Sequence, residues 1–192
     1  MEKIVLQTGD IFFTDNFSTA SKIVKFLMQS PTIYQQLWRW FKGTLNEVRF
    51  YHAGMVLNEE EMIEQEEDVR IRPVVKIFKK DYIIWRKNDL TEQEKNRLVE
   101  VAVADLGEGY DVLLCVGKLF TWLTGIPFFT RWIQQKEKEI CVTRVAYWYS
   151  EALGEDFGCK NWNFVTTDII DDYCVVNFKD WTQVAIHIKE EE

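Results

Sequence analysis

Apolar and polar residues alternate between residues 49 and 86 in a way that is typical of half-buried β-strands. The pattern predicts strands at about 49–57, 61–66, 69–76 and 81–86, and a turn at 58–61 joins the first two into a hairpin. Two more short strands are expected at 173–178 and 183–189. Near the start, Gly9 and Asp10 interrupt an apolar segment and predict a turn.

Segments with helical periodicity occupy most of the remaining chain. Helices are predicted at 18–42, 91–107 and 111–123, and from Cys141 to about Gly154. The helix at 91–107 starts with a capping box, in which Thr91 and Glu94 satisfy each other's backbone N–H groups. The chain has no repeats and no low-complexity linker, so we expect a single domain over residues 1–192.

Composition and charge narrow the classes of function. The 192 residues are 47% hydrophobic and 28% charged, which is typical of a globular protein. The net charge of −8 argues against a nucleic acid partner, because phosphate binding needs a basic surface. The first residues do not have the pattern of a signal peptide, and the four cysteines form no CxxC pair. We therefore expect reduced thiols, a cytoplasmic location and no membrane-spanning segment.

The predicted hairpin carries the most informative chemistry in the chain. His52 lies on its first strand, and Glu64 follows twelve residues later on the return strand. A carboxylate placed there can accept one imidazole N–H and leave the other nitrogen free to act as a base. Gly54 faces the same side as His52 and leaves space for a substrate or for another backbone. Glu66 faces the same side as Glu64 and is its rival, whereas Gln65 faces away.

A base of this kind needs a nucleophile, and Cys141 is the best candidate. It is the only cysteine at the predicted start of a helix, where the helix dipole stabilises a thiolate. Cys115 and Cys174 lie in apolar segments, which we expect in the core, and Cys159 lies in a loop. The alternative is that Cys141 is a small apolar residue that only packs in a buried helix.

The stretch from His52 to Glu64 resembles the histidine hairpin of the NlpC-type papain-like hydrolases. In that family the histidine begins a strand of the form H-x-G, which apolar residues continue. The polar residue that completes the catalytic triad follows the histidine by twelve residues. The order of the parts is unusual, because His52 precedes Cys141 by 89 residues. That order resembles the circularly permuted branch of the superfamily.

Other motifs agree with that branch in order and spacing, over about residues 8–172. They are Gly9-Asp10, Gly109-Tyr110-Asp111, Cys141 to Val145 (compare C-S-E-L-V) and Thr166 to Ile170 (compare T-P-x-D-L). Two features depart from the pattern. Val142-Thr143 stands where the family has Ser-Glu, and a long segment before His52 contains an aromatic cluster at 38–41.

The resemblance implies an α+β papain-like fold, NlpC-type and circularly permuted, in which a small antiparallel sheet or barrel packs against the helix of Cys141. It implies attack of a thiolate on an amide, ester or thioester carbonyl to form an acyl-enzyme. The backbone N–H of Cys141 is the expected oxyanion donor, and Tyr110 is a further expected substrate contact beside Gly54. The reaction requires no metal and no cofactor.

Three functions remain open on the sequence. The first is a cysteine peptidase or amidase acting on small peptide or amide substrates, such as cell-wall peptides or aminoacyl compounds. The second is a lipid-directed acyl hydrolase or transferase, because the lecithin:retinol acyltransferase group also resembles this permuted order. Trp38, Trp40 and Phe41 could touch lipid, but a buried amphipathic helix explains them better, so membrane contact is not favoured. The third is a binding protein without turnover. The sequence gives neither the substrate nor the oligomeric state.

Overall fold

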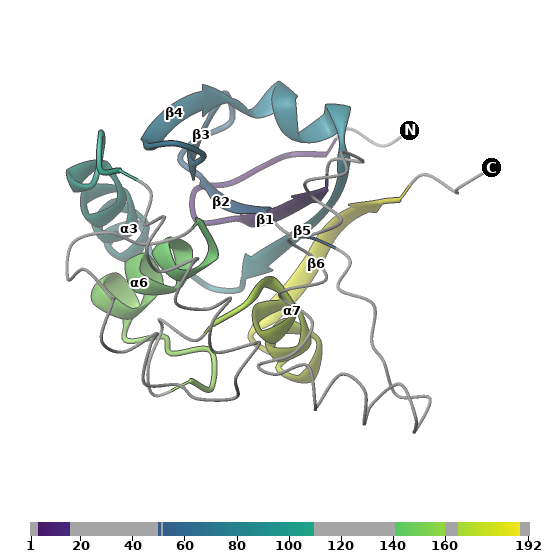
Figure 1. Ribbon diagram of the computed structural model, residues 1–192. Coiled ribbons are helices and arrows are strands. Elements are labelled where there is room, and N and C mark those ends of the chain that lie inside the picture. Colours follow the sequence, from purple (N-terminus) through teal and green to yellow (C-terminus); the bar gives the residue numbers. More distant parts are fainter. Residues whose placement is uncertain (1–3, 16–49, 51, 110–140, 160–164, 189–192) are drawn as a thin grey trace, which may run out of the picture.

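A six-stranded antiparallel sheet forms the centre of the part of the chain that the structure describes (Figure 1). The computed structural model describes residues 4–15, 50, 52–109, 141–159 and 165–188. The strands are β1 (Ile11–Asp15), β2 (His52–Val56), β3 (Glu61–Gln65), β4 (Val69–Pro73), β5 (Asp81–Lys87) and β6 (Trp181–His187). Their order across the sheet is β4-β3-β2-β1-β5-β6, so β4 and β6 are its edges.

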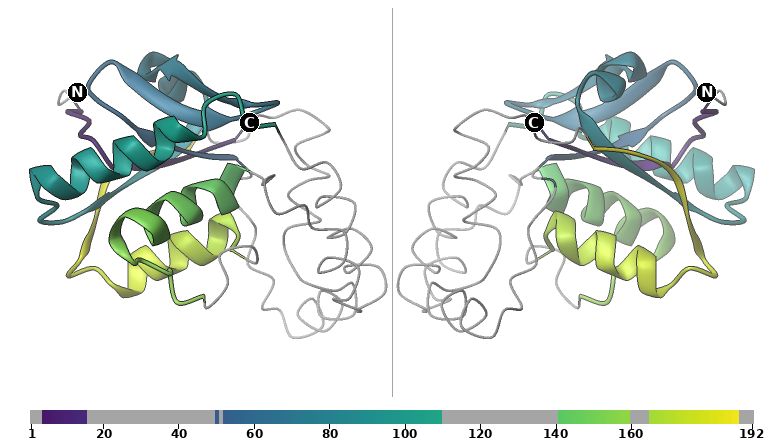
Figure 2. Two further views of the ribbon diagram at one scale, coloured as in Figure 1. Left: turned by 90° about the vertical axis from the view of Figure 1, so that its left-hand side faces the viewer. Right: turned by 90° about the vertical axis from the view of Figure 1, so that its right-hand side faces the viewer.

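Helices cover one face of this sheet (Figure 2). They are α3 (Glu92–Ala104), α6 (Cys141–Leu153) and α7 (Thr167–Val176), while the short 3₁₀ helix η1 (Val74–Lys79) connects β4 to β5. Successive side chains of β1 point to opposite faces of the sheet. Ile11 and Phe13 pack in the core with the three α-helices, and Phe12 packs on the other face with Leu6 and Ile77.

The predicted hairpin forms between β2 and β3. Gly54 lies directly opposite Glu64, and the turn is held by the Asn58 side chain, whose Oδ1 accepts the N–H groups of Glu60 and Glu61. The predicted capping box of α3 is also confirmed, since the Thr91 and Glu94 side chains each accept the other's backbone N–H. Both features depend on residues close in sequence, which is why local patterns predict them.

Long-range polar contacts fix α6 against the rest of the chain. Asp105, at the C-terminal end of α3, accepts hydrogen bonds from the Arg144 guanidinium at 3.0 Å and from Trp148 Nε1 at 2.8 Å. The Tyr149 hydroxyl donates to the carbonyl oxygen of Gly9, in the predicted turn before β1. Three residues from the middle of α6 therefore determine where its first residue, Cys141, lies.

The predicted papain-like fold is wrong for this chain. We expected a small antiparallel sheet or barrel, but the described residues form one broad sheet of six antiparallel strands, to which β6 is added at the edge beside β5. The motifs that suggested the fold are local and report the hairpin and the cysteine helix. The pairing of β5 with β6 joins residues far apart in the sequence, and local motifs contain no information about it.

The predicted strand at 173–178 is also wrong, because most of this segment belongs to α7. The β-branched and aromatic residues there favour a strand locally. Thr166 overrides that preference: its side chain accepts the N–H of Ile169 and caps the helix, which then buries Ile170 and Cys174 against the sheet.

The helices predicted at 18–42 and 111–123, and the aromatic cluster at 38–41, lie outside the described residues. Within the described ranges, none of the helices combines the length and the apolar character needed to cross a bilayer.

We predict that Gly54→Ala destabilises the fold. A Cβ atom at this position would lie 2.3 Å from Phe12 Cζ and 2.7 Å from the carbonyl oxygen of Ile63. Because one of these neighbours is backbone, we expect a loss of about 1–3 kcal/mol in the free energy of unfolding, measured by urea denaturation. Gly109→Ala is the matched control, since its added Cβ would meet no atom of the described residues within 4 Å. Equal stability of the two variants would contradict the packing at Gly54.

Candidate active site

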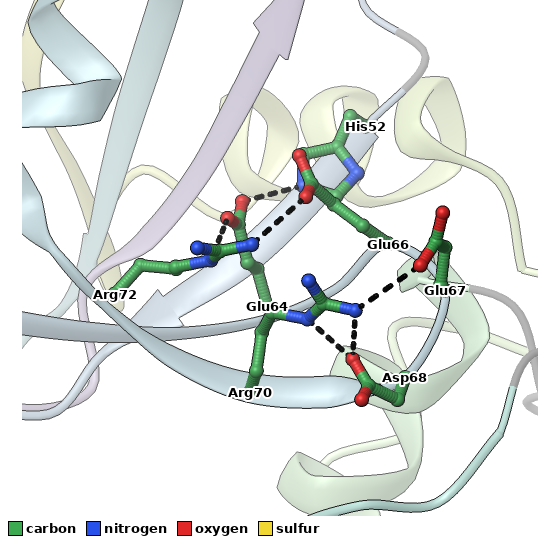
Figure 3. Close-up of polar contacts among 7 residues, drawn as sticks. All are labelled: His52, Glu64, Glu66, Glu67, Asp68, Arg70 and Arg72. Atoms are coloured by element: carbon green, nitrogen blue, oxygen red, sulfur yellow. Dashed lines mark hydrogen bonds and ion pairs between the residues drawn. The ribbon is translucent and has the colours of Figure 1, made fainter.

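Three elements bring His52, Glu64 and Cys141 together. His52 is the first residue of β2, Glu64 lies on the neighbouring β3, and Cys141 begins α6, which packs against β2. His52 Nε2 lies 2.8 Å from Glu64 Oε2, and the His52 and Cys141 side chains are hydrogen-bonded to each other (Figure 3 shows the histidine and the carboxylate). The sequence predicted this grouping, and the structure places all three side chains in contact.

Since Nε2 of the imidazole faces Glu64, the other ring nitrogen, Nδ1, is left for the thiol. Each partner stabilises the protonated ring. Burial alone lowers the pKa of His52, but the hydrogen bonds and charges of Cys141 and Glu64 outweigh it and raise that pKa to about 10. The arrangement therefore favours an imidazolium at neutral pH.

The sulfur of Cys141 experiences the reverse effect. Burial alone raises the pKa of the thiol, but the hydrogen bond and the charge of His52 outweigh it, and the pKa falls below its usual value. The backbone N–H groups of Ala53 and Val142 also donate hydrogen bonds to the sulfur and stabilise its negative charge. The buried contact between Cys141 and His52 therefore favours the thiolate–imidazolium form of the pair.

Glu64, and not its neighbours, is the carboxylate of this site. Its side chain is only 3% exposed, whereas that of Glu66 is 44% exposed and lies 3.5 Å from Arg72. Burial raises the pKa of Glu64, but the hydrogen bond from His52 overcomes this and keeps the pKa below its usual value. Gln65 points elsewhere and donates to the Gly109 carbonyl at 3.1 Å.

The other two described cysteines differ from Cys141 in acidity. Burial raises the pKa of the half-buried Cys159, and the charge of Asp156 raises it further. Cys174 is fully buried on α7, where burial and nearby carboxylates raise its pKa strongly. Of the three described thiols, only that of Cys141 has a lowered pKa.

Of the two residues expected to contact substrate, only Gly54 lies among the described residues. The space beside Gly54 is filled by the Phe12 ring and by the Ile63 carbonyl, so no substrate group fits there. The absence of a side chain at Gly54 serves the close approach of protein atoms, which was the other explanation considered for this glycine. Tyr110 lies outside the described residues, as does Cys115.

Sequence reasoning missed several groups that shape the site. The donors from Ala53 and Val142 are backbone groups, which no residue pattern reveals. Arg72, on the edge strand β4, has its Nε atom 3.9 Å from Glu64 Oε1. Alternation along 69–73 places Arg72 on the same face of the sheet as Arg70, the residue opposite Glu64, and that pattern was the available signal.

Comparisons with known proteins support the fold alone. No protein-family model and no curated protein matches the chain. A solved structure described as the metalloprotein yiiX from Escherichia coli O157:H7, DUF1105, is similar, with a TM-score of 0.62 and 19% sequence identity. The alignment covers 95% of this chain and 98% of that one. This likeness extends over nearly the whole chain, and the description of the similar structure names DUF1105.

The description of that structure as a metalloprotein raises the question of a metal here. Among the described residues, no group of three or more His, Cys, Asp or Glu side chains is arranged to hold a metal ion. The residues that come together at the candidate site are engaged with one another, as nucleophile, base and carboxylate. The described donor set does not fit a metal ion, and we derive no step through one.

We predict that Glu64→Gln raises the pH at which Cys141 becomes alkylated. The substitution keeps the volume but removes the negative charge that favours the imidazolium, so the thiolate loses stabilisation. A charge-assisted hydrogen bond contributes ~1.5–3 kcal/mol, which corresponds to a shift of about one to two pH units. The measurement is the rate of iodoacetamide alkylation as a function of pH.

Glu66→Gln is the control for this experiment, because that side chain is 44% exposed and lies just beyond the end of β3. It should shift the curve much less. If the alkylation curve shifts more for Glu66→Gln than for Glu64→Gln, Glu66 is the carboxylate that orients His52. If neither variant shifts the curve, another residue orients His52.

Proposed function

We propose that this protein is a cysteine-dependent hydrolase of an amide or related acyl bond, with Cys141 as nucleophile, His52 as acid and base, and Glu64 as the carboxylate that orients His52. The observation that carries the proposal is the buried contact of Cys141, His52 and Glu64, between α6 and the β2–β3 hairpin, which favours a thiolate–imidazolium pair. Perturbed pKa values of this kind, caused by burial together with specific partners, cluster at functional sites.

In the first half of the reaction the Cys141 sulfur attacks the carbonyl carbon of the substrate. The negative charge moves to the carbonyl oxygen, where backbone N–H groups at the start of α6, that of Cys141 in particular, are our candidates for stabilising it. The imidazolium of His52 gives its proton to the leaving nitrogen or oxygen. The carbon–heteroatom bond breaks, and a thioester joins the acyl group to Cys141.

In the second half a water molecule replaces the leaving group. Neutral His52 takes a proton from the water as it attacks the thioester carbonyl, and the acid product leaves as the thiolate is regenerated. Glu64 stabilises the imidazolium in both halves and keeps Nε2 occupied, so that Nδ1 faces the sulfur. The substrate we favour is a small peptide or amide, such as a cell-wall peptide or an aminoacyl compound.

The chemistry requires Cys141 to be reduced. All three described cysteines are free thiols, and the cytoplasm is the compartment in which thiols stay reduced. We therefore propose a cytoplasmic location.

We predict that Cys141 reacts faster than Cys159 in a brief, limiting pulse of iodoacetamide at mildly acidic pH. Exposure favours Cys159, which is half-buried, whereas Cys141 is 6% exposed. Ionisation favours Cys141, because its pKa is lowered and that of Cys159 is raised. Peptide mass spectrometry measures both. Preferential labelling of Cys159 would remove Cys141 as the nucleophile, and His52→Asn should abolish the preference.

The function itself is tested with p-nitrophenyl acetate as an activated acyl donor. We expect a burst of nitrophenol, an acetyl group on the Cys141 peptide, and slower release of that group as acetate. Cys141→Ser should eliminate the burst, and Cys174→Ser should leave it unchanged. A protein that alkylates rapidly at Cys141 but never becomes acetylated would be a binding protein with a reactive thiol, which is the competing function.

A further inference from the structure

Arg72 occupies an unusual position beside the candidate site. It lies on the edge strand β4, and its side chain is 28% exposed. Its guanidinium lies between the carboxylates of Glu64 and Glu66 (Figure 3). Nε lies 3.9 Å from Glu64 Oε1, and Nη2 lies 3.5 Å from Glu66 Oε2. Although Arg72 is partly exposed, its Nε atom is buried and makes no hydrogen bond within the described residues.

The two oxygens of Glu64 therefore face different partners. Oε2 accepts the hydrogen bond of His52, and Oε1 faces the buried Nε of Arg72. A guanidinium is planar and always charged, so it can restrain the orientation of a carboxylate as well as its ionisation. The hydrogen bond of His52 already keeps Glu64 ionised, so a cation at Oε1 acts chiefly on the orientation of the carboxylate.

We propose that Arg72 is a positioning residue of this site: it holds Glu64 turned towards His52, and it acts on Cys141 only through that carboxylate. The inference rests on the proposed function, because it assigns Arg72 a part in the same thiolate–imidazolium pair. Glu66 is the second anchor of the guanidinium, and it keeps Arg72 at the surface end of the site.

Other charges face Glu64 and differ from Arg72 in geometry. Lys76 and Lys80, in and just after η1, act on it through their charges, without a hydrogen bond. Arg70 lies directly opposite Glu64 across the β3–β4 pair, but its guanidinium turns away and binds Asp68, with Glu67 at 3.6 Å. Figure 3 shows the two arginines on one strand with their side chains directed to different carboxylates.

This difference makes Arg70 a matched control. Arg70 and Arg72 are two residues apart on one face of the same edge strand, so replacing either by Met removes one positive charge at a similar place. Only Arg72 has an atom within ion-pair distance of Glu64. An effect of surface charge or of β4 stability would therefore appear in both variants. An effect on the position of Glu64 would appear only when Arg72 is replaced.

The experiment measures the pH dependence of Cys141 alkylation by iodoacetamide in the full chain. We expect Arg72→Met to move the acidic limb of the curve to higher pH, in the direction of Glu64→Gln but by a smaller amount. Arg72→Lys, which keeps the charge but not the planar fork, should recover part of the shift. Arg70→Met should leave the curve unchanged.

The double variant Arg72→Met with Glu64→Gln decides whether Arg72 acts through the carboxylate. We expect its curve to coincide with that of Glu64→Gln alone. An additional shift in the double variant, or a wild-type curve in Arg72→Met, would overturn the inference, as would a shift to lower pH. The proposed function fails separately, if wild-type Cys141 shows the acidity of an ordinary thiol. Arg72→Lys keeps the test decisive should Arg72→Met not fold.

Discussion

A buried imidazole shared between a sulfur and a carboxylate is the interaction on which this site depends. His52 is nearly inaccessible to solvent, and burial alone would keep its ring neutral. It takes a charge because Cys141 and Glu64 each supply a negative charge at hydrogen-bond distance. None of the three groups would be ionised in the same way if another were removed, so the chemistry belongs to the group and not to the cysteine alone.

The scaffold is organised to hold that arrangement. The sheet fixes His52 and Glu64 by the register of one hairpin, in which Gly54 opposite Glu64 allows Phe12 to pack closely. The helix is fixed independently, by bonds from Arg144 and Trp148 to Asp105. The hairpin and the helix, each with its own anchors, meet at the sulfur and together orient the thiol.

Features determined by neighbouring residues could be predicted from the sequence, and features determined by distant ones could not. The spacing of His52 and Glu64 predicted their contact, because a short turn leaves the hairpin few registers. The sequence predicts a strand where the helix buries Cys174, since these residues favour extended structure and the cap at Thr166 opposes them. The prediction of the fold class was wrong because the position of β6 is determined by its tertiary pairing with β5.

The two halves of the candidate site leave the ribosome at different times. The β2–β3 hairpin is continuous in sequence, but Cys141 follows His52 by 89 residues. Until α6 docks on the sheet, the sulfur has the acidity of a free cysteine and is protected by its proton from oxidation and adventitious alkylation. The acidity of the Cys141 thiol therefore depends on native packing between two segments that are distant in the sequence.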